Sequence, residues 1–418
     1  MSATRGEGAG PLDALRQRKA EHMRLAADET VEVRTAPGWG DVHLVHDALP
    51  EVDLADVDLG VELLGRRLGL PLAIAGMTGG HDGATAVNAT LARAAERHGL
   101  AIGLGSQRVA LADPSLEPTF AVVREQAPNA LVIGNIGAAQ LIEQDGRPPL
   151  SDRQLARIVE MIAADALAVH LNVLEESVQP EGDRRARGVA AAIERLSATI
   201  GVPVIVKETG AGISRETALR LRDAGVAALD VGGLGGTSFA LIERLRAQRQ
   251  CDRRGIELGE DLGEWGIPTA VAVVGARAAG LPVIATGGVR SGLDGAKALA
   301  LGARAVGVAR PLLLAALDGD AAVDAWLERF RGTLATVLQL TGCRRVDELA
   351  SRPLVVEGRT RAWLDGLGYA LRPQAGGGAA AGGGGAGSGG AGSGAAAGGG
   401  AAGGGARPAA APRTAVAR

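Results

Sequence analysis

Short apolar runs alternate with helix-length segments between residues 72 and 317. The runs are rich in Val, Ile, Leu and Ala and show no polar alternation, as expected of strands that are buried on both faces. Between them lie segments such as SRETALRLRDAG, which ends in Gly, as helices often do. The eight strand candidates are LAIA (72–75), LAIG (100–103), ALVIG (130–134), ALAVH (166–170), PVIVK (203–207), ALDVG (228–232), PVIAT (282–286) and AVGVA (305–309).

Eight strand–helix units predict a closed (β/α)8 TIM barrel of the α/β class, because an open doubly wound sheet rarely contains so many regular repeats. We expect residues 1–71 to form an N-terminal extension with a helix over 11–29, and residues 72–350 to form the barrel with its accessory helices. Further helices are predicted over 321–340 and 344–364, and residues 351–373 are a C-terminal segment. Gly and Ala dominate residues 374–418, so this tail buries too little apolar surface to offset its ordering entropy and is predicted to be disordered.

In such a barrel the functional site lies at the carboxyl ends of the strands. Polar or glycine-rich residues follow all eight strand candidates, which predicts that they surround one mouth. In chain order, the stretches that follow the strands are GMTGG, LGSQR, NIGA, HLNVLEESVQPEGD, ETGAGIS, VGGLGGTS, TGGVRSG and ARP.

Two of these stretches predict an anion site. TGGVRSG and Arg310 follow the seventh and eighth strands, where barrels commonly bind a phosphate with backbone N–H groups and a helix N-terminus. A hydroxyl at Thr237 or Ser238 adds to this surface, although glycines there also permit tight turns without any ligand. Lys207, at the end of the fifth strand, forms a Schiff base, pairs with Glu208, or places its charge against an electron-accepting cofactor ring. We favour flavin mononucleotide (FMN), with Lys207 near the ring edge that gains negative charge on reduction.

The stretch HLNVLEESVQPEGD (170–183) concentrates polar side chains directly after the fourth strand. Glu175 and Glu176 are expected on a loop, and Mg2+ takes one or two carboxylates and completes its shell with water and substrate phosphate. That coordination suits a diphosphate substrate, whereas the alternative is a solvated acidic loop. His170 and Asn172 also fit ordinary hydrogen-bonding residues at a strand end.

A second anion clamp is predicted where the N-terminal helix meets the stretch SQR (106–108). Arg18 and His22 in QRKAEH share a helical face, and Lys19 follows Arg18. Arginine binds phosphate oxygens with two N–H groups. Taken alone, this helix pattern is more typical of a solvated surface. Trp265, in the long loop after the sixth strand, is expected either to cover a flavin or an apolar substrate, or to pack against the protein.

Composition excludes several classes of partner. The formal net charge is −3 and no basic stripe is interleaved with aromatic residues, so no nucleic-acid partner is expected. Cys251 and Cys343 lie far apart without ligand spacing, which argues against a disulfide framework or a zinc site. MSATRGEGAG lacks the apolar region of a signal peptide, and no apolar run approaches the roughly 20 residues of a membrane span, so we expect a cytoplasmic protein without a membrane partner.

Lysine is rare in a chain that uses arginine almost everywhere. Of the 44 basic residues only Lys19, Lys207 and Lys297 are lysines. A compact ammonium with a tunable pKa is therefore expected to matter at Lys19 and Lys207, the two that fall in predicted site stretches.

These stretches, taken together, resemble the type 2 isopentenyl-diphosphate delta-isomerases, over about residues 11–350 in unbroken order. The motifs that carry the resemblance are RKAEH (18–22), MTGG (77–80), GLGSQR (103–108), GNIGA (134–138), HLNVLEESVQPEGD (170–183), VKETGAGIS (206–214), DVGGLGGTSF (230–239), WGIPT (265–269), ATGGVRSGLD (285–294) and VARP (308–311). The resemblance implies a TIM barrel that uses FMN, Mg2+ and a reductant such as NADPH, and that converts isopentenyl diphosphate into dimethylallyl diphosphate. It also implies a homo-oligomer, a tetramer or an octamer.

Carried over residue by residue, the resemblance implies four groups of site residues. The diphosphate substrate would be bound by Arg18, Lys19, Ser106, Gln107, Arg108 and Glu175, and Mg2+ by Glu176. FMN would be bound by Met77, Thr78, Gly79, Ser106, Asn135, Lys207, Thr237, Gly288, Val289, Arg290, Ala309 and Arg310. Glu175, His22 and Trp265 are the candidate catalytic residues.

One departure from the family pattern concerns the substrate. Where the family has Gln followed by Glu, this chain has Glu175 and Glu176. A carboxylate at 175 is a stronger base than an amide but repels a diphosphate unless Mg2+ or protonation relieves the charge. Gly76 before Met77 and Thr209 in place of an apolar residue are smaller departures.

Three alternative functions compete with the isomerase. An FMN-dependent 2-hydroxy-acid oxidase needs a His–Arg pair after the glycine-rich strands, and no His follows His170. An enzyme like IMP dehydrogenase needs a nucleophilic Cys in the active-site loop, whereas Cys251 follows a predicted helix. The third is an FMN-binding homologue whose turnover is impaired or altered by Glu175.

Overall fold

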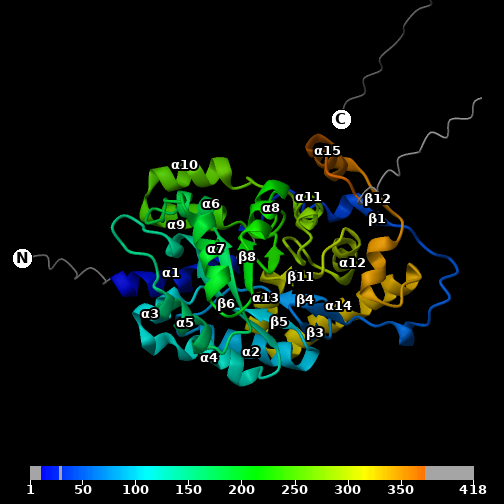
Figure 1. Cartoon of the computed structure of the whole chain (residues 1–418), viewed down its shortest axis with the longest axis horizontal. Coiled ribbons are helices and arrows are strands. Elements are labelled where there is room, and N and C mark those ends of the chain that lie inside the picture. The colour runs from blue at the N-terminus through cyan, green and yellow to red at the C-terminus, as the bar shows by residue number, and fades with distance from the viewer. Residues whose placement is uncertain (1–10, 28–30, 372–418) are drawn as a thin grey trace, which may run out of the picture. The chain divides into compact units, whose positions relative to one another are not determined.

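The computed structural model describes residues 11–27 and 31–371, with side chains from residue 17 on. They all belong to one compact unit, Met1–Pro373, and are coloured along the chain in Figure 1. The segment 374–418, for which disorder is predicted, lies outside the described residues. No helix in the described part of the chain combines the length and the apolar character that a membrane crossing demands.

Eight parallel strands close into a barrel, as the sequence predicts. Neighbouring strands pair in the order β10-β11-β4-β5-β6-β7-β8-β9, and closure is completed where Val306 of β11 is in register with Leu72 of β4. Each strand falls within a few residues of its expected position. The strands are β4 (Leu72–Ile74), β5 (Ala101–Gly103), β6 (Leu131–Gly137), β7 (Ala166–Leu171), β8 (Val204–Glu208), β9 (Ala228–Asp230), β10 (Val283–Thr286) and β11 (Ala305–Val308).

Helices surround the barrel (Figure 1) and bury one face against it. One of them, α8, begins at a Ser cap, because the Ser214 hydroxyl accepts from the Thr217 N–H at 3.2 Å and so satisfies a free donor of the first turn. The helices of the barrel layer are α2 (Ala84–His98), α3 (Arg108–Ala112), α4 (Pro118–Gln126), α5 (Asp152–Met161), α7 (Val189–Thr199), α8 (Arg215–Asp223), α11 (Thr269–Ala276), α12 (Gly292–Ala300) and α13 (Arg310–Asp318).

A small hairpin closes the amino-terminal end of the barrel. Its strands are β2 (Val61–Leu63) and β3 (Arg66–Leu68), which pair antiparallel. Val61, Leu63 and Leu68 are buried in one cluster with inward-facing side chains of the barrel strands. This apolar plug leaves the opposite, carboxyl-terminal end as the place for a polar site.

The C-terminal part differs from its prediction. The helix expected over 321–340 is α14 (Asp320–Leu340), but the single helix expected over 344–364 is wrong. That stretch forms the 3-10 helix η7 (Val346–Ser351), β12 (Leu354–Val356) and α15 (Gly358–Leu367). Pro353 cannot continue a helix, and β12 instead pairs antiparallel with β1 (Val42–Leu44) of the N-terminal extension.

Four helices and a short 3-10 turn build the mouth from outside the regular repeat. α1 (Pro11–Ala26) contacts α3 and α9. η5 (Ala138–Leu141) follows β6, and α6 (Val173–Val178) follows β7. α9 (Phe239–Gln250) and α10 (Arg253–Leu262) follow β9. The remaining 3-10 turns are η2 (Trp39–Asp41), η3 (Leu54–Asp56), η4 (Pro114–Leu116) and η6 (Arg277–Ala279).

Candidate active site

A cavity of about 250 Å³ opens at the carboxyl ends of the barrel strands. Residues that follow or end each of the eight strands line it, so the predicted convergence on one mouth is confirmed. A neighbouring cavity of about 840 Å³ shares part of its wall. Representatives from the eight strands are Met77, Ser106, Asn135, His170, Lys207, Thr237, Gly288 and Ala309.

Nearly all predicted site residues lie in this wall, including α1 side chains far away in sequence. α1 therefore contributes to the mouth and is not merely a solvated helix. The predicted residues that line the cavity are Arg18, Lys19, His22, Met77, Thr78, Gly79, Ser106, Arg108, Asn135, Glu175, Glu176, Lys207, Thr237, Gly288, Val289, Arg290, Ala309 and Arg310. Gln107 and Trp265 are absent from the wall.

Gln107 supports the wall from behind, which corrects its expected contact with a diphosphate. Its side chain is fully buried. Its amide donates to the Ile158 carbonyl at 2.9 Å and accepts from the Asn135 N–H at 3.0 Å. The buried carboxamide thus fixes the main chain that carries Asn135 and does not line the cavity.

Trp265 does not cover the site, which corrects its expected role as a lid and catalytic residue. Its side chain is 65% exposed and lies in the loop between α10 and α11.

Glu175 and Glu176 lie in the first turn of α6 and not on a loop, contrary to expectation. The Asn172 side chain, just before the helix, donates to Glu175 at 3.2 Å and to Glu176 at 3.0 Å. Glu176 also accepts from the Asp183 N–H at 2.7 Å. One amide group therefore orients both carboxyl groups toward the cavity.

Burial changes the charge of this acidic pair. Burial, followed by the charges of Glu243 and Glu176, raises the pKa of Glu175 to about 8. Burial also raises the pKa of Glu176, although hydrogen bonds oppose the change. At neutral pH Glu175 is therefore predominantly a neutral carboxylic acid, which donates and accepts hydrogen bonds as a carboxamide does.

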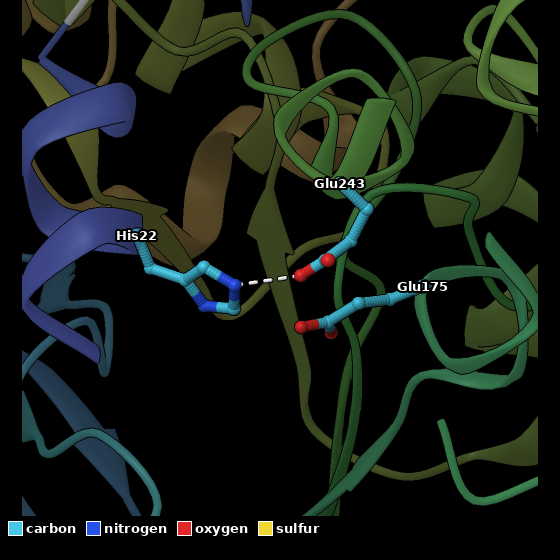
Figure 2. A group of neighbouring side chains, drawn as sticks. All are labelled: His22, Glu175 and Glu243. Atoms are coloured by element: carbon cyan, nitrogen blue, oxygen red, sulfur yellow. Dashed lines mark hydrogen bonds and ion pairs between the residues drawn. The ribbon is translucent and has the colours of Figure 1, made fainter. Parts of the chain in front are cut away.

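Glu243 is a site residue that no motif indicated. It comes from α9, is fully buried, and lies between His22 Nε2 at 2.6 Å and Arg246 Nη1 at 2.5 Å. Figure 2 shows the side chains of His22, Glu243 and Glu175 gathered at one point of the mouth. The only sequence signal was weak: Glu243 shares a helical face with the buried Ala240 and Ala247.

The same three side chains offer one ligand atom each within 4.8 Å of one another, so they have the spacing to hold a metal ion. Their charges are already balanced, however. Burial lowers the pKa of His22 and so favours its neutral form. The Arg246 guanidinium compensates the Glu243 carboxylate, and Glu175 is neutral at pH 7. Glu176, the expected Mg2+ ligand, lies outside this group.

Three cations, Arg18, Lys19 and Arg108, also line the cavity. Lys19 Nζ donates to the carbonyls of Gly79 at 3.0 Å and Ser106 at 2.6 Å. Burial, with the nearby charges of Arg18 and Arg108, lowers the pKa of Lys19 to about 7. Like charges that are held close together away from water repel one another, and a bound anion would relieve this repulsion.

Acidic partners hold the two arginines of this cluster. Arg18 lies 3.6 Å from Glu181, and Arg108 lies 3.2 Å from Asp183. Asp183 also binds Arg147 at 2.5 Å, and its main chain supports Glu176. This network links the cationic cluster to the carboxylate that was expected to bind Mg2+.

A glycine-rich cradle lies across the mouth, after β9 and β10. Gly288 has φ +65°, and a Cβ there would lie 2.4 Å from the Gly235 carbonyl oxygen. The Thr237 hydroxyl is buried and has no hydrogen-bond partner among the described residues. A buried hydroxyl without a partner is costly in a folded protein, so a ligand acceptor or donor is expected there.

Lys207 and His170 complete the wall between the cradle and the cations. Lys207 Nζ lies 3.3 Å from the Glu208 carbonyl, whereas the Glu208 carboxylate binds the N–H groups of Gly210 at 2.6 Å and Gly212 at 3.1 Å. Lys207 and Glu208 therefore do not form the simple ion pair that was one of the alternatives for Lys207. Burial, then the charge of Lys207, lowers the pKa of His170 to about 3, so its imidazole is neutral.

Comparison with known proteins gives one consistent group of relatives. The family described as FMN-dependent dehydrogenase matches residues 181–356. Proteins named isopentenyl-diphosphate delta-isomerase match nearly the whole described chain. The relative from Methanoregula boonei is 49% identical over 83% of this chain and 96% of its own length. The relatives from Methanosarcina barkeri and Archaeoglobus fulgidus are each 46% identical, over 86% and 84% of this chain and 97% and 98% of their own lengths.

Solved structures share the fold at low sequence identity. A mandelate oxidase mutant with the monooxide FMN adduct has a TM-score of 0.52 at 21% identity, and covers 83% of this chain and 100% of its own. A putative lactate oxidase from Pediococcus acidilactici has a TM-score of 0.58 at 17% identity, over 83% and 94% of the two chains. At such identities the likeness establishes the barrel fold alone.

Proposed function

The chain belongs to the isopentenyl-diphosphate delta-isomerase family, and on that basis we propose that it converts isopentenyl diphosphate into dimethylallyl diphosphate with bound FMN. The observation that carries the proposal is the pairing of two anion sites in one cavity. The glycine cradle forms one side, and Arg18, Lys19 and Arg108 form the other. A cofactor with one phosphate and a substrate with two would satisfy both.

Features of the cradle support FMN as the cofactor. The partnerless Thr237 hydroxyl and the backbone around Gly288, where a Cβ would collide, suit a phosphate that approaches the main chain closely. Thr237, Val289, Arg290 and Ala309 would surround the phosphate. The remaining expected ligands, all of which line the cavity, are Met77, Thr78, Gly79, Ser106, Asn135, Lys207 and Arg310.

FMN, once bound and reduced, supplies an acid and base group next to the hydrocarbon end of the substrate. The protein contributes position and charge. Lys207 offers a positive charge beside the cofactor, and neutral His170 is oriented by Asn135 at 2.9 Å. Because the double-bond shift adds a proton at one carbon and removes one at another, a fixed orientation of the substrate is the main demand on the chain.

The diphosphate end would be held by the cationic cluster and by Mg2+. Glu176 is the carboxylate of α6 that faces both cavities, and a divalent cation there would offset its unfavourable burial. Binding of the diphosphate would in turn favour the protonated form of Lys19, whose pKa is low without an anion. Substrate and cation would therefore stabilise the site together.

Glu175 stands where the family has Gln, and its protonation state decides how closely it resembles that amide. As a neutral acid it imitates the amide at pH 7, so wild type and Glu175→Gln should have kcat/KM values within about threefold of each other at this pH. Above about pH 8 the acid of the wild type ionises and repels the diphosphate, so kcat/KM of the wild type should fall below that of Glu175→Gln. Parallel pH profiles of both proteins measure the difference. A Glu175→Gln variant that alone turns over at pH 7 would favour the flavoprotein with impaired turnover.

The competing 2-hydroxy-acid oxidase is less well supported. Its solved relatives share only the fold with this chain, and the last histidine, His170, is neutral, partly buried and hydrogen-bonded to Asn135. A histidine that abstracts a proton next to an arginine would need a free nitrogen and a partner in the mouth.

An omission assay tests the proposed function. Purified protein should be yellow, and oxygen-free incubation with reduced FMN, Mg2+ and isopentenyl diphosphate should give the dimethylallyl isomer. Omission of the reductant or of Mg2+ should abolish or strongly lower the yield, and 2-hydroxy acids should not reduce the flavin. A colourless protein that FMN cannot reconstitute would refute the proposal.

Three further features are proposed on the family resemblance alone. NADPH is the expected source of reducing equivalents for the flavin. The protein is expected to assemble as a tetramer or an octamer, and to act in the cytoplasm.

A further inference from the structure

A short segment of the N-terminal extension crosses the glycine cradle. This segment, residues 31–37, is called the strap below. The Ser238 N–H donates to the Val31 carbonyl at 2.9 Å, and the Val33 N–H donates to the Gly236 carbonyl at 3.0 Å. Glu32 forms an antiparallel bridge with Thr237. The strap is therefore fixed to the loop that was predicted to bind the cofactor phosphate.

Glu32 of the strap binds both arginines of the predicted phosphate site. One carboxylate oxygen accepts from Arg290 Nη2 at 2.7 Å and from Arg310 Nη1 at 2.8 Å. Glu32 is one-third exposed and Arg310 is largely buried. A carboxylate thus already occupies part of the positive field that would attract a phosphate.

Arg310 makes further contacts that point away from a cofactor. Its Nε donates to the Ala26 carbonyl at 2.9 Å, and its Nη2 donates to the Ala27 carbonyl at 3.1 Å. These carbonyls lie at the carboxyl end of α1, where a helix has unsatisfied acceptors and a partial negative charge. Arg310 therefore holds the end of the helix that carries Arg18, Lys19 and His22.

Arg290 is in a different position. Among the described residues, the Arg290 guanidinium donates, apart from Glu32, only to the carbonyl of its neighbour Val289, at 3.1 Å, and its side chain is 40% exposed. A phosphate in the cradle can recruit Arg290 by competing with Glu32, whereas Arg310 is engaged by α1 on its other nitrogens. Arg310 therefore holds the end of α1, whereas Arg290 is available to bind a phosphate.

We propose that Glu32 is a positioning residue that couples the two anion sites: it fixes Arg310 on the end of α1 and competes with the cofactor phosphate for Arg290. For the substrate this inference rests on the proposed function. For FMN it rests on the proposed position of the cofactor phosphate, and for α1 it rests only on the contacts of Glu32 and Arg310. Loss of the Glu32 charge should consequently strengthen the binding of FMN and weaken the binding of the diphosphate substrate.

The isosteric change Glu32→Gln tests this coupling. We expect the Kd of FMN for the apoprotein to fall by about three- to tenfold, because one competing charge is removed. Amide hydrogen exchange within residues 19–26 should become faster, because Arg310 loses its fixed orientation. KM for isopentenyl diphosphate should rise by a similar factor with little change in kcat. Flavin fluorescence measures the first effect and exchange mass spectrometry the second, both without turnover.

Glu264→Gln is the matched control. The Glu264 carboxylate holds the same strap through the N–H groups of Arg34 at 2.7 Å and Thr35 at 2.9 Å, and it contacts neither Arg290 nor Arg310. This variant should leave the Kd of FMN unchanged. A Glu32→Gln variant that binds FMN more weakly, or that behaves like Glu264→Gln, would overturn the inference. Absence of isomerase turnover with the expected FMN and exchange effects would refute only the proposed function.

Discussion

A Gly288→Ala variant should purify without flavin, and its Kd for FMN should rise by about 100-fold or more. The residue has φ +65°, which disfavours any side chain. An added Cβ would also lie 2.4 Å from the Gly235 carbonyl oxygen and 2.6 Å from Pro37 of the strap. Main-chain atoms cannot move aside as a flexible side chain can, so the cradle and the strap must separate.

Gly280→Ala is a control that carries the cost of a side chain at positive φ without the steric collision of the added Cβ. Gly280 has φ +71°, and a Cβ there would meet no atom within 4 Å. It precedes β10, whereas Gly288 follows the same strand, so it lies away from the mouth. Flavin absorbance per polypeptide and titration of the apoproteins compare the two variants. Equal retention of FMN by both would contradict the location of the cofactor phosphate in the cradle.

The Lys19→Met variant should lose about 100-fold or more in kcat/KM for isopentenyl diphosphate. Removal of one partner from a buried charged contact costs roughly 2–5 kcal/mol, and each 1.36 kcal/mol is a factor of ten in rate. Lys19 is a partly buried member of the cationic cluster, and its charge is the one that Arg18 and Arg108 repel when no anion is present. Steady-state kinetics of the reduced holoenzyme measure the loss.

Two further variants test the same lysine. Because its pKa is about 7, Lys19 loses its proton as the pH rises above 7, and kcat/KM should fall with it. Lys19→Arg stays charged, so this fall near pH 7 should disappear. Lys297→Met is a control outside the cavity, since Lys297 Nζ donates to the Trp39 carbonyl at 2.7 Å. If Lys19→Met harmed kcat/KM no more than Lys297→Met, the diphosphate site would lie elsewhere.

The barrel and its mouth were predictable because they depend on local patterns. Strands that are buried on both faces read as apolar runs, and the parallel topology then places every following loop at one end. His170 and Lys207 could be assigned to the wall by this rule alone, although 37 residues separate them. Convergence of distant loops thus follows from topology without any knowledge of side-chain contacts.

Local rules failed where tertiary contacts decide. Glu175 and Glu176 were expected on a loop, but Asn172 supports both carboxyl groups and a short helix forms. The helix expected over 344–364 is broken by Pro353, whose following residues find β1 as a partner strand. Neither the strand partner nor the hydrogen-bonding partner is visible in a short window of sequence.

The most informative omissions are charged residues without a motif. Glu243 is buried against His22, which is 221 positions away in the chain, and Glu32 binds arginines 258 and 278 positions away. A single carboxylate in a helix or a connecting segment has no spacing pattern, so only the folded structure reveals that it faces a cation. Gln107 and Trp265 show the converse, because membership in a motif did not determine where these side chains point.

The proposed function requires one cavity that holds the flavin and the diphosphate next to each other. The most direct test is an oxygen-free titration of the reduced holoenzyme with isopentenyl diphosphate, followed through the absorbance of the bound flavin. We predict a saturable spectral change in the wild type that requires far more ligand in Lys19→Met. If calorimetry detected binding of isopentenyl diphosphate while the flavin spectrum stayed unchanged, the result would contradict a shared cavity for flavin and diphosphate.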